Sequence, residues 1–202
     1  GDSAVFSLAE GALPDTRFSG GGAVTWPRDT ILYDFQVIAP QVSLEDLRWV
    51  SPDFPSMRGS AVLAARSISG TRTEYDIREL QLEAGRQRVT GELVALTDRR
   101  RGLGVRDMRL QLRELDLDAV RPYLDTLPFY GTLSGTVAGS GFLDAIDVRL
   151  DWAFADARVP GNPVTTIAGE GGVGARGEQG LVFTAFEVRS SDVDLRTARL
   201  LA

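Results

Sequence analysis

The sequence contains no cysteine, no histidine and no lysine, so all 22 of its basic residues are arginine. These absences exclude thiol and Ser-His nucleophilic catalysis, Schiff-base chemistry and transition-metal sites that need imidazole or thiolate. Carboxylate chemistry and oxygen-ligand metals such as calcium are left. Lack of cysteine does not indicate a compartment, because an envelope protein can fold without disulfides.

The charge balance argues against a nucleic-acid partner. The net charge is -6 and the isoelectric point is near 4.8, whereas sequence-independent binding to nucleic acid needs clustered basic residues. The one basic run, Arg99 to Arg101, is interpreted as a solvated turn. No signal peptide and no apolar run of about 18 residues is present. Since the chain starts without Met, we expect a fragment or a processed chain.

A block of about 75 residues occurs nearly three times in the chain, as the distances between the starts of its copies indicate. The copies begin VSLEDLRWV at Val42, LDLDAVRPYL at Leu115 and VDLRTARLLA at Val193. Each copy has the frame apolar-x-Leu-x-x-apolar-Arg, which ends at Arg48, Arg121 and Arg199. Repeats of this length predict one elongated domain, divided as follows: 1–41, the end of an earlier repeat; 42–114 and 115–192, two repeat units; 193–202, the start of the next.

Most of the sequence alternates between apolar and polar residues, which predicts strands with one apolar face. In the segment that holds Tyr75 and Ile77 the apolar phase shifts by one before Leu80, and a bulge there would keep all of them on one face. Turn signals divide the runs into strands. The expected strands are 4–9, 17–26, 30–38, 57–68, 72–84, 88–96, 103–115, 130–139, 144–157, 163–173 and 180–193.

Short punctuating segments separate the four-strand units. Ser43, with Asp46 behind it, resembles a helix N-cap, and Asp118 is expected to cap the second copy. Leu44, Leu47 and Val50 then fall at helical spacing, and so do Val120, Leu124 and Leu127 after Asp118. We therefore expect one or two helical turns per copy, packed over the end of the sheet.

A meander of long strands with almost no helix must bury its apolar face in one of two ways. It folds on itself as a dry sandwich or barrel, or it curls around something apolar. For each apolar residue, ordinary core packing is the alternative to a ligand wall. The candidate wall residues are Val37, Tyr75, Ile77, Leu80, Leu82, Val89, Leu93, Met108, Leu110, Leu112, Leu133, Val137, Ile146, Val148, Leu150, Trp152, Phe154, Phe183, Phe186 and Val188.

The repeating frame resembles the AsmA/TamB family of Gram-negative envelope proteins. The resemblance lies in the step Leu115-Asp116-Leu117, repeated as Val193-Asp194-Leu195, in the proline-containing stretch that follows, and in the glycine-rich strand from Gly131 to Gly139. It implies an extended antiparallel β-sheet with an apolar groove, the β-taco. It also implies a periplasmic protein anchored in the inner membrane, which moves phospholipid between the two membranes. TamB-type members work with an outer-membrane barrel assembly factor.

Three other sequence patterns resemble functional motifs, and each is interpreted as a structural feature. Gly169-x-Gly171-x-x-Gly174 matches the dinucleotide fingerprint by letter, but no helix is expected after it. The alternating acids Glu114, Asp116 and Asp118 are interpreted as a solvated strand face rather than a calcium site. For Arg48, Arg121 and Arg199 we favour an ion pair or a cap to a nearby carbonyl over contact with lipid phosphate.

The sequence thus predicts an all-β fold: an extended, curled antiparallel sheet of four-strand repeats with short helical turns between them. The expected function is a segment of a periplasmic bridge-like protein whose apolar groove carries phospholipid acyl chains between the inner and outer membranes. We expect no catalysis, no cofactor and no metal. The alternative is a structural or adhesive β-repeat module with a closed dry core. A carbohydrate-active enzyme, which would need a pair of close, buried carboxylates, is a third class.

Overall fold

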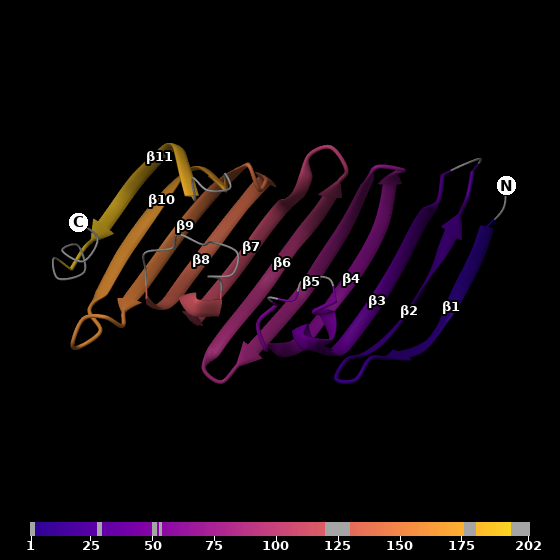
Figure 1. The fold of residues 1–202 in the computed structure, drawn as a ribbon, viewed down its shortest axis with the longest axis horizontal. Coiled ribbons are helices and arrows are strands. Elements are labelled where there is room, and N and C mark those ends of the chain that lie inside the picture. Colours follow the sequence, from indigo (N-terminus) through magenta and orange to yellow (C-terminus); the bar gives the residue numbers. More distant parts are fainter. Residues whose placement is uncertain are drawn as a thin grey trace.

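The computed structural model describes residues 3–27, 30–49, 52, 54–119, 130–175 and 181–194. Over these residues the chain forms a single antiparallel sheet of 11 strands, and each strand pairs with its neighbours in sequence (Figure 1). The predicted all-β antiparallel meander is therefore confirmed. The strands are β1 (Ser3–Ala12), β2 (Arg17–Thr25), β3 (Leu32–Ser43), β4 (Arg58–Ser69), β5 (Arg72–Ala84), β6 (Gln87–Asp98), β7 (Gly102–Asp116), β8 (Gly131–Phe142), β9 (Ala145–Asp156), β10 (Val164–Ala175) and β11 (Leu181–Asp192).

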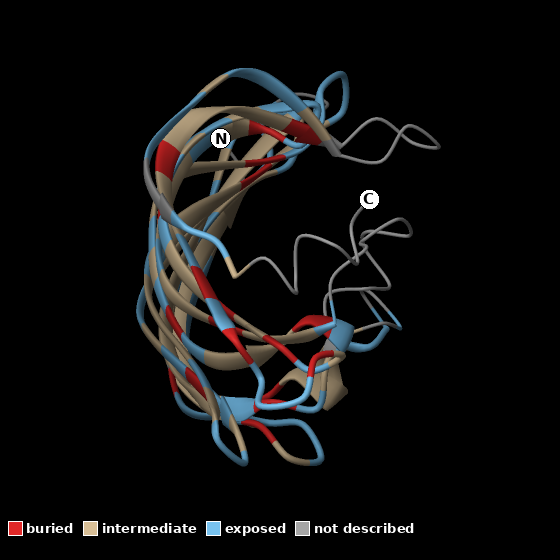
Figure 2. Cartoon of the chain, turned by 90° about the vertical axis from the view of Figure 1, so that its left-hand side faces the viewer, coloured by how far each residue is buried: buried red, intermediate tan, exposed pale blue. Residues whose placement is uncertain are grey.

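The sheet is strongly curled, so that one face is concave and the other convex (Figure 2). Strands β4 to β7 and β8 to β11 correspond to the two expected four-strand units, and β1 to β3 correspond to the tail before them. The third strand is longer than the expected 30–38. It continues through Val42 and Ser43, which pair with Gly59 and Arg58 beyond an irregularity after Ala39.

The punctuating segments are short 3-10 turns, η1 (Leu44–Leu47) and η2 (Leu117–Ala119). Ser43 occupies the N-cap position of η1, as predicted, but its side chain makes no capping hydrogen bond. It is fully buried, and its backbone N–H donates to Thr16 Oγ1 at 2.9 Å. Asp118, the expected cap, lies inside η2, where its backbone N–H donates to the carboxylate of Asp116 at 3.0 Å. Val50, Val120, Leu124 and Leu127 lie outside the described residues.

β-bulges keep the apolar side chains on one face where the sequence phase shifts. The predicted shift between Ile77 and Leu80 is confirmed, with Glu79 at a φ of 51°. Comparable irregularities in β7 and β11 place Asp107, Glu114 and Ala185 at φ values of 52°, 48° and 49°. Since a bulge adds one residue, the apolar alternation resumes on the original face after each of them.

Serine hydroxyls on β8 bind the backbone of two bulges in β7. The N–H of Asp107 donates to Ser140 Oγ, and the N–H of Glu114 donates to Ser134 Oγ, each at 2.9 Å. A bulge leaves a backbone N–H outside the ladder, and an unsatisfied donor is costly. Ser134 and Ser140 of the glycine-rich strand β8 therefore stabilise the two bulges of β7 by accepting hydrogen bonds from their backbone N–H groups.

Gly135 of β8 has a conformation and a position that require glycine. Its φ is +139°, and a Cβ built on it would overlap the carbonyl oxygen of Asp151 on β9. Gly135 pairs with Trp152 of β9 on the apolar face. The small residue therefore lets the backbones of β8 and β9 approach beside a large aromatic side chain.

Candidate functional site: the apolar concave face

The strand register places all the predicted wall residues on one face of the sheet. Residues that pair across antiparallel strands point to the same side, and so do residues two apart within a regular strand. One row, running from β3 to β6, consists of Val37, Leu63, Ile77 and Leu93. A second row, running from β5 to β11, consists of Leu80, Gly91, Leu110, Val137, Leu150, Gly169 and Val188. No position in either row carries a charge.

The apolar face is the concave one. Both 3-10 segments lie on the concave side of the sheet (Figures 1 and 2). Leu117 of η2 packs in one buried cluster with Leu112, Leu133 and Phe154. These three side chains belong to the apolar face. Leu133 pairs with Phe154 and with Leu115, and the bulge between Leu112 and Leu115 keeps both leucines on the same side of β7. The punctuating segment thus covers the apolar face at one rim of the sheet.

Most of the apolar face is only partly buried. Among the predicted wall residues, those with buried side chains are Leu82, Leu112, Leu133, Leu150 and Phe154. Near the end strand, Phe183 and Val188 are 58% and 56% exposed, and the other predicted wall residues are intermediate. Within the described ranges, no second sheet packs against this face, and the strands make substantial contacts only with their sheet neighbours and with η2.

Several side chains of the concave face were not predicted from the sequence. Phe35 pairs with Ala65, and Val105 with Ala95, in line with predicted residues of the same strands. Leu63 was missed because Val62 beside it is also apolar, so the alternation in β4 cannot be read from the sequence. Ile167 pairs with Trp152 and extends the face into β10. Each of these residues is identified as part of the concave face because it pairs across the strands with a residue already placed on that face.

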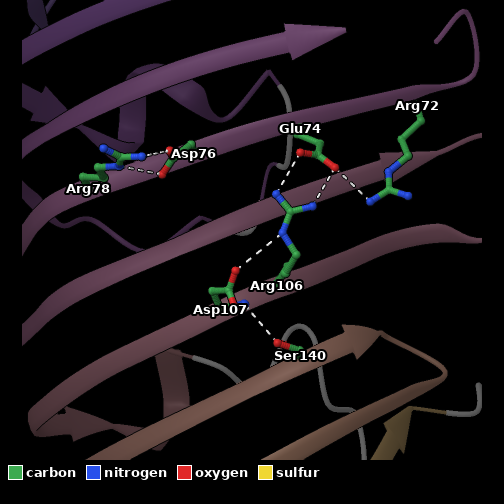
Figure 3. A network of polar contacts seen from close by, with 7 residues as sticks. All are labelled: Arg72, Glu74, Asp76, Arg78, Arg106, Asp107 and Ser140. Carbon is green, nitrogen blue, oxygen red and sulfur yellow. Dashed lines mark hydrogen bonds and ion pairs between the residues drawn. The ribbon is translucent and has the colours of Figure 1, made fainter. Parts of the chain in front are cut away.

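The convex face carries ion pairs within and between strands (Figure 3), and two buried apolar side chains, Leu96 and Phe142, also lie on it. Arg106 of β7 donates two hydrogen bonds of 2.8 Å to the two carboxylate oxygens of Glu74 on β5, and Arg72 donates a third of 2.8 Å. These bonds to Arg106, with the charges of both arginines, hold the pKa of Glu74 below its usual value, although partial burial opposes the shift. Further along the sheet, Arg149 pairs with Glu170 at 3.0 Å.

Two shallow depressions also lie on the convex side. The larger, of about 600 Å³, is lined by charged residues that include Arg66, Arg78 and Arg106. These guanidinium groups are paired with Asp34, Asp76 and Glu74. Because each of these three cations already has a carboxylate partner, the larger depression offers none of these guanidinium groups unpaired to an anionic ligand.

The structure also shows where the competing motifs lie. Gly169, Gly171 and Gly174 are inside strand β10, and no helix follows them in the described residues. Arg48 donates to the carbonyl oxygen of Phe54 at 3.2 Å and lies 4.0 Å from Glu45, which confirms the interpretation as a cap and ion pair. Arg121 and Arg199 lie outside the described residues.

Carboxylates in the described ranges form no cluster suited to a metal ion. The fully buried carboxylate there belongs to Asp156, at the end of β9. It accepts hydrogen bonds from the backbone N–H and the guanidinium of Arg158, at 2.9 and 3.2 Å. Asp156 therefore anchors the turn after β9. Among the residues that were placed, no helix has the length and apolar character needed to span a membrane.

Comparison of the chain with protein-family models, curated proteins and solved structures finds no match. The resemblance to the AsmA/TamB family therefore rests on the residues of the chain alone. Over the described residues, the structure establishes a one-layer, curled antiparallel sheet with an apolar concave face and a convex face that carries ion pairs.

Proposed function

We propose that the concave face binds phospholipid acyl chains and lets them move along the sheet. In this proposal the chain is a segment of a periplasmic bridge-like protein, anchored in the inner membrane, that carries phospholipid between the inner and outer membranes. The full-length protein would work with an outer-membrane barrel assembly factor, as the resemblance implies. No residue performs chemistry, and the convex face remains in water.

The observation that supports this proposal most directly is the continuous apolar strip on the concave face. It crosses the sheet from β3 to β11 without a charged side chain in its two rows. At about 4.8 Å per strand, the strip from β3 to β11 spans roughly 38 Å along the direction in which a chain would travel. An acyl chain has no groups that need specific hydrogen bonds, so a continuous apolar wall is sufficient to hold it.

The closed-core alternative requires a second layer over this face. A sandwich buries the inner residues of both sheets. Here Leu110 and Val137, in the middle of the strip, are not fully buried, and no layer covers them among the described residues. Apolar surface exposed on this scale is typical of a binding site or an interface, and this favours an apolar occupant.

The test combines native mass spectrometry with site-specific photocrosslinking. A benzophenone side chain is introduced at Leu110 on the concave face or at Gln111, the next residue of β7, on the convex face. Val37 and Ile38 of β3 give a second matched pair, since Ile38 is 57% exposed on the convex side. The protein is expressed in Gram-negative cells, irradiated and analysed for attached phospholipid.

We expect phospholipid to co-purify and to attach at Leu110 and Val37, with little at Gln111 and Ile38. Neighbouring positions share the same strand and the same distance to the sheet edge, so only the face differs within each pair. Equal attachment on both faces would indicate non-specific contact. A lipid-free protein without attachment at either concave position would support the structural module with a closed core.

A further inference from the structure

The end of the concave face opposite η1 and η2 carries a cluster of hydroxyl groups. Tyr33 is the second residue of β3, and its hydroxyl lies 2.9 Å from Thr73 Oγ1 and 3.5 Å from the hydroxyl of Tyr75. Thr97, near the end of β6, pairs with Thr73 and adds a further hydroxyl to the same face. The hydrogen bond with Tyr33, together with burial, raises the pKa of Tyr75, so the Tyr75 hydroxyl stays protonated at neutral pH.

A depression of about 410 Å³ lies beside this cluster. Tyr33, Thr73 and Thr97 form its wall on the concave side, and Leu103, which pairs with Thr97, continues that wall. The turns that follow β4 and β6 and the adjoining strand ends supply most of the rest, including Arg99, and Ile31 before β3 adds an apolar side chain. The depression is therefore where the apolar concave face meets a polar rim.

Arg99 is the cation of this rim that has no protein partner in the described residues. Its backbone N–H donates to the carbonyl of Thr71 at 3.0 Å, and its guanidinium takes part in no hydrogen bond or ion pair there. The other arginine that lines the depression, Arg72, is paired with Glu74. Asp98 also lines it, but its carboxylate accepts the backbone N–H groups of the next turn, at 2.8 and 3.1 Å.

Polarity along the strands is graded from this rim inward. Thr73 lies next to the rim, and two residues further along β5, about 7 Å, is Tyr75. The row beyond it, which includes Ile77 and Leu63, is entirely apolar. An amphiphile with its polar group at the rim would therefore meet hydroxyls first and hydrocarbon side chains afterwards.

We propose that this rim depression binds the phosphate of an amphiphile whose acyl chain lies on the concave face, with the Arg99 guanidinium and the free hydroxyl proton of the hydrogen-bonded Tyr33–Thr73 pair as donors. The site rests on the proposed function, because it requires the concave face to hold the chain. Arginine is suited to the role since its planar guanidinium binds phosphate oxygens through charge-assisted hydrogen bonds.

The experiment compares three probes: lauroyl lysophosphatidate, monolaurin and inorganic phosphate. The two amphiphiles share a chain and a glycerol and differ in the phosphate. Binding is measured by calorimetry below the micelle concentration, with the parent, Arg99→Gln, Arg100→Gln and the double variant Tyr33→Phe/Thr73→Val. Arg100 is the matched control, because it is an exposed arginine of the same turn that does not line the depression.

We expect the parent to bind lysophosphatidate roughly tenfold more tightly than monolaurin, the gain expected of one or two hydrogen bonds to a charged group. Arg99→Gln should remove most of this preference and leave monolaurin binding unchanged, the double variant should reduce it, and Arg100→Gln should retain it. Equal affinity for the two amphiphiles would overturn the phosphate site alone. Inorganic phosphate bound as tightly as lysophosphatidate would also overturn it, in favour of a free-phosphate site. Binding of neither amphiphile would refute the proposed function itself.

Discussion

Replacement of Gly135 by alanine tests whether the close approach of β8 and β9 depends on a missing side chain. Two costs are expected. The φ of +139° is one that L side chains rarely adopt, and such backbone strain costs about 1–3 kcal/mol. The new Cβ would also overlap the carbonyl oxygen of Asp151, so the two strands must separate and weaken adjacent hydrogen bonds, each worth about 1 kcal/mol. We expect a total loss of about 3–4 kcal/mol in the free energy of unfolding.

Gly102→Ala is the matched control for backbone strain. Gly102 has a φ of +79° at the β6–β7 turn, and a Cβ there would have no atom within 4 Å. Only backbone strain should destabilise this variant, and its free energy of unfolding should fall by about 1 kcal/mol. The difference of about 2–3 kcal/mol between the two variants measures the crowding together with the greater strain at a φ of +139°.

The assay is urea unfolding followed by far-ultraviolet circular dichroism, with native-state hydrogen exchange as a local readout. In Gly135→Ala, exchange protection should fall most in β8 and β9, whereas Gly102→Ala should affect the turn alone. Equal losses of stability in the two variants would refute the crowding argument, because strain alone would then account for both.

Three further substitutions test the polar contacts. Glu74→Gln should cost roughly 1 kcal/mol near neutral pH. Because folding lowers the Glu74 pKa, its stabilisation is present above its unfolded value of about 4.5 and is lost as the pH falls through the lower folded value; acid titration of parent and variant should therefore converge, and parallel curves would contradict this. Ser134→Ala leaves the N–H of Glu114 without its partner and should cost about 1–2 kcal/mol, with faster hydrogen exchange at that amide; unchanged exchange would show that the serine is dispensable. Asp156→Ala leaves Arg158 without its buried partner and should cost about 3 kcal/mol in thermal or urea unfolding; a loss below 1 kcal/mol would show that the pair contributes little.

The strands could be predicted from the sequence wherever polar and apolar residues alternate cleanly. In β9 the alternation from Ile146 to Phe154 identifies both the strand and its concave face. In β3 and β4 it fails, because Val37 and Ile38, like Val62 and Leu63, place apolar residues on both faces. Only the register with the neighbouring strand separates the two faces there.

The rim site could not be predicted from the sequence, for a different reason. Tyr33 and Thr73 are 40 residues apart, and their hydroxyls meet only because β3 and β5 both flank β4. A single polar residue near the start of a strand does not indicate which residue of a distant strand its side chain will contact. Bulges are similar: the shift before Leu80 is visible in the sequence, whereas the one at Glu114 depends on a glycine and a serine in the next strand.

The position of η1 and η2 at the same rim follows from the even number of strands between them, which has a consequence for length. Four antiparallel strands return the chain to the edge from which it started, pointing in the same direction. A whole unit can therefore be inserted or removed without turning the concave face over, and each unit changes the span by about 19 Å. The reach of a protein of this design therefore changes in fixed increments of one four-strand unit, while the fold of each unit stays the same.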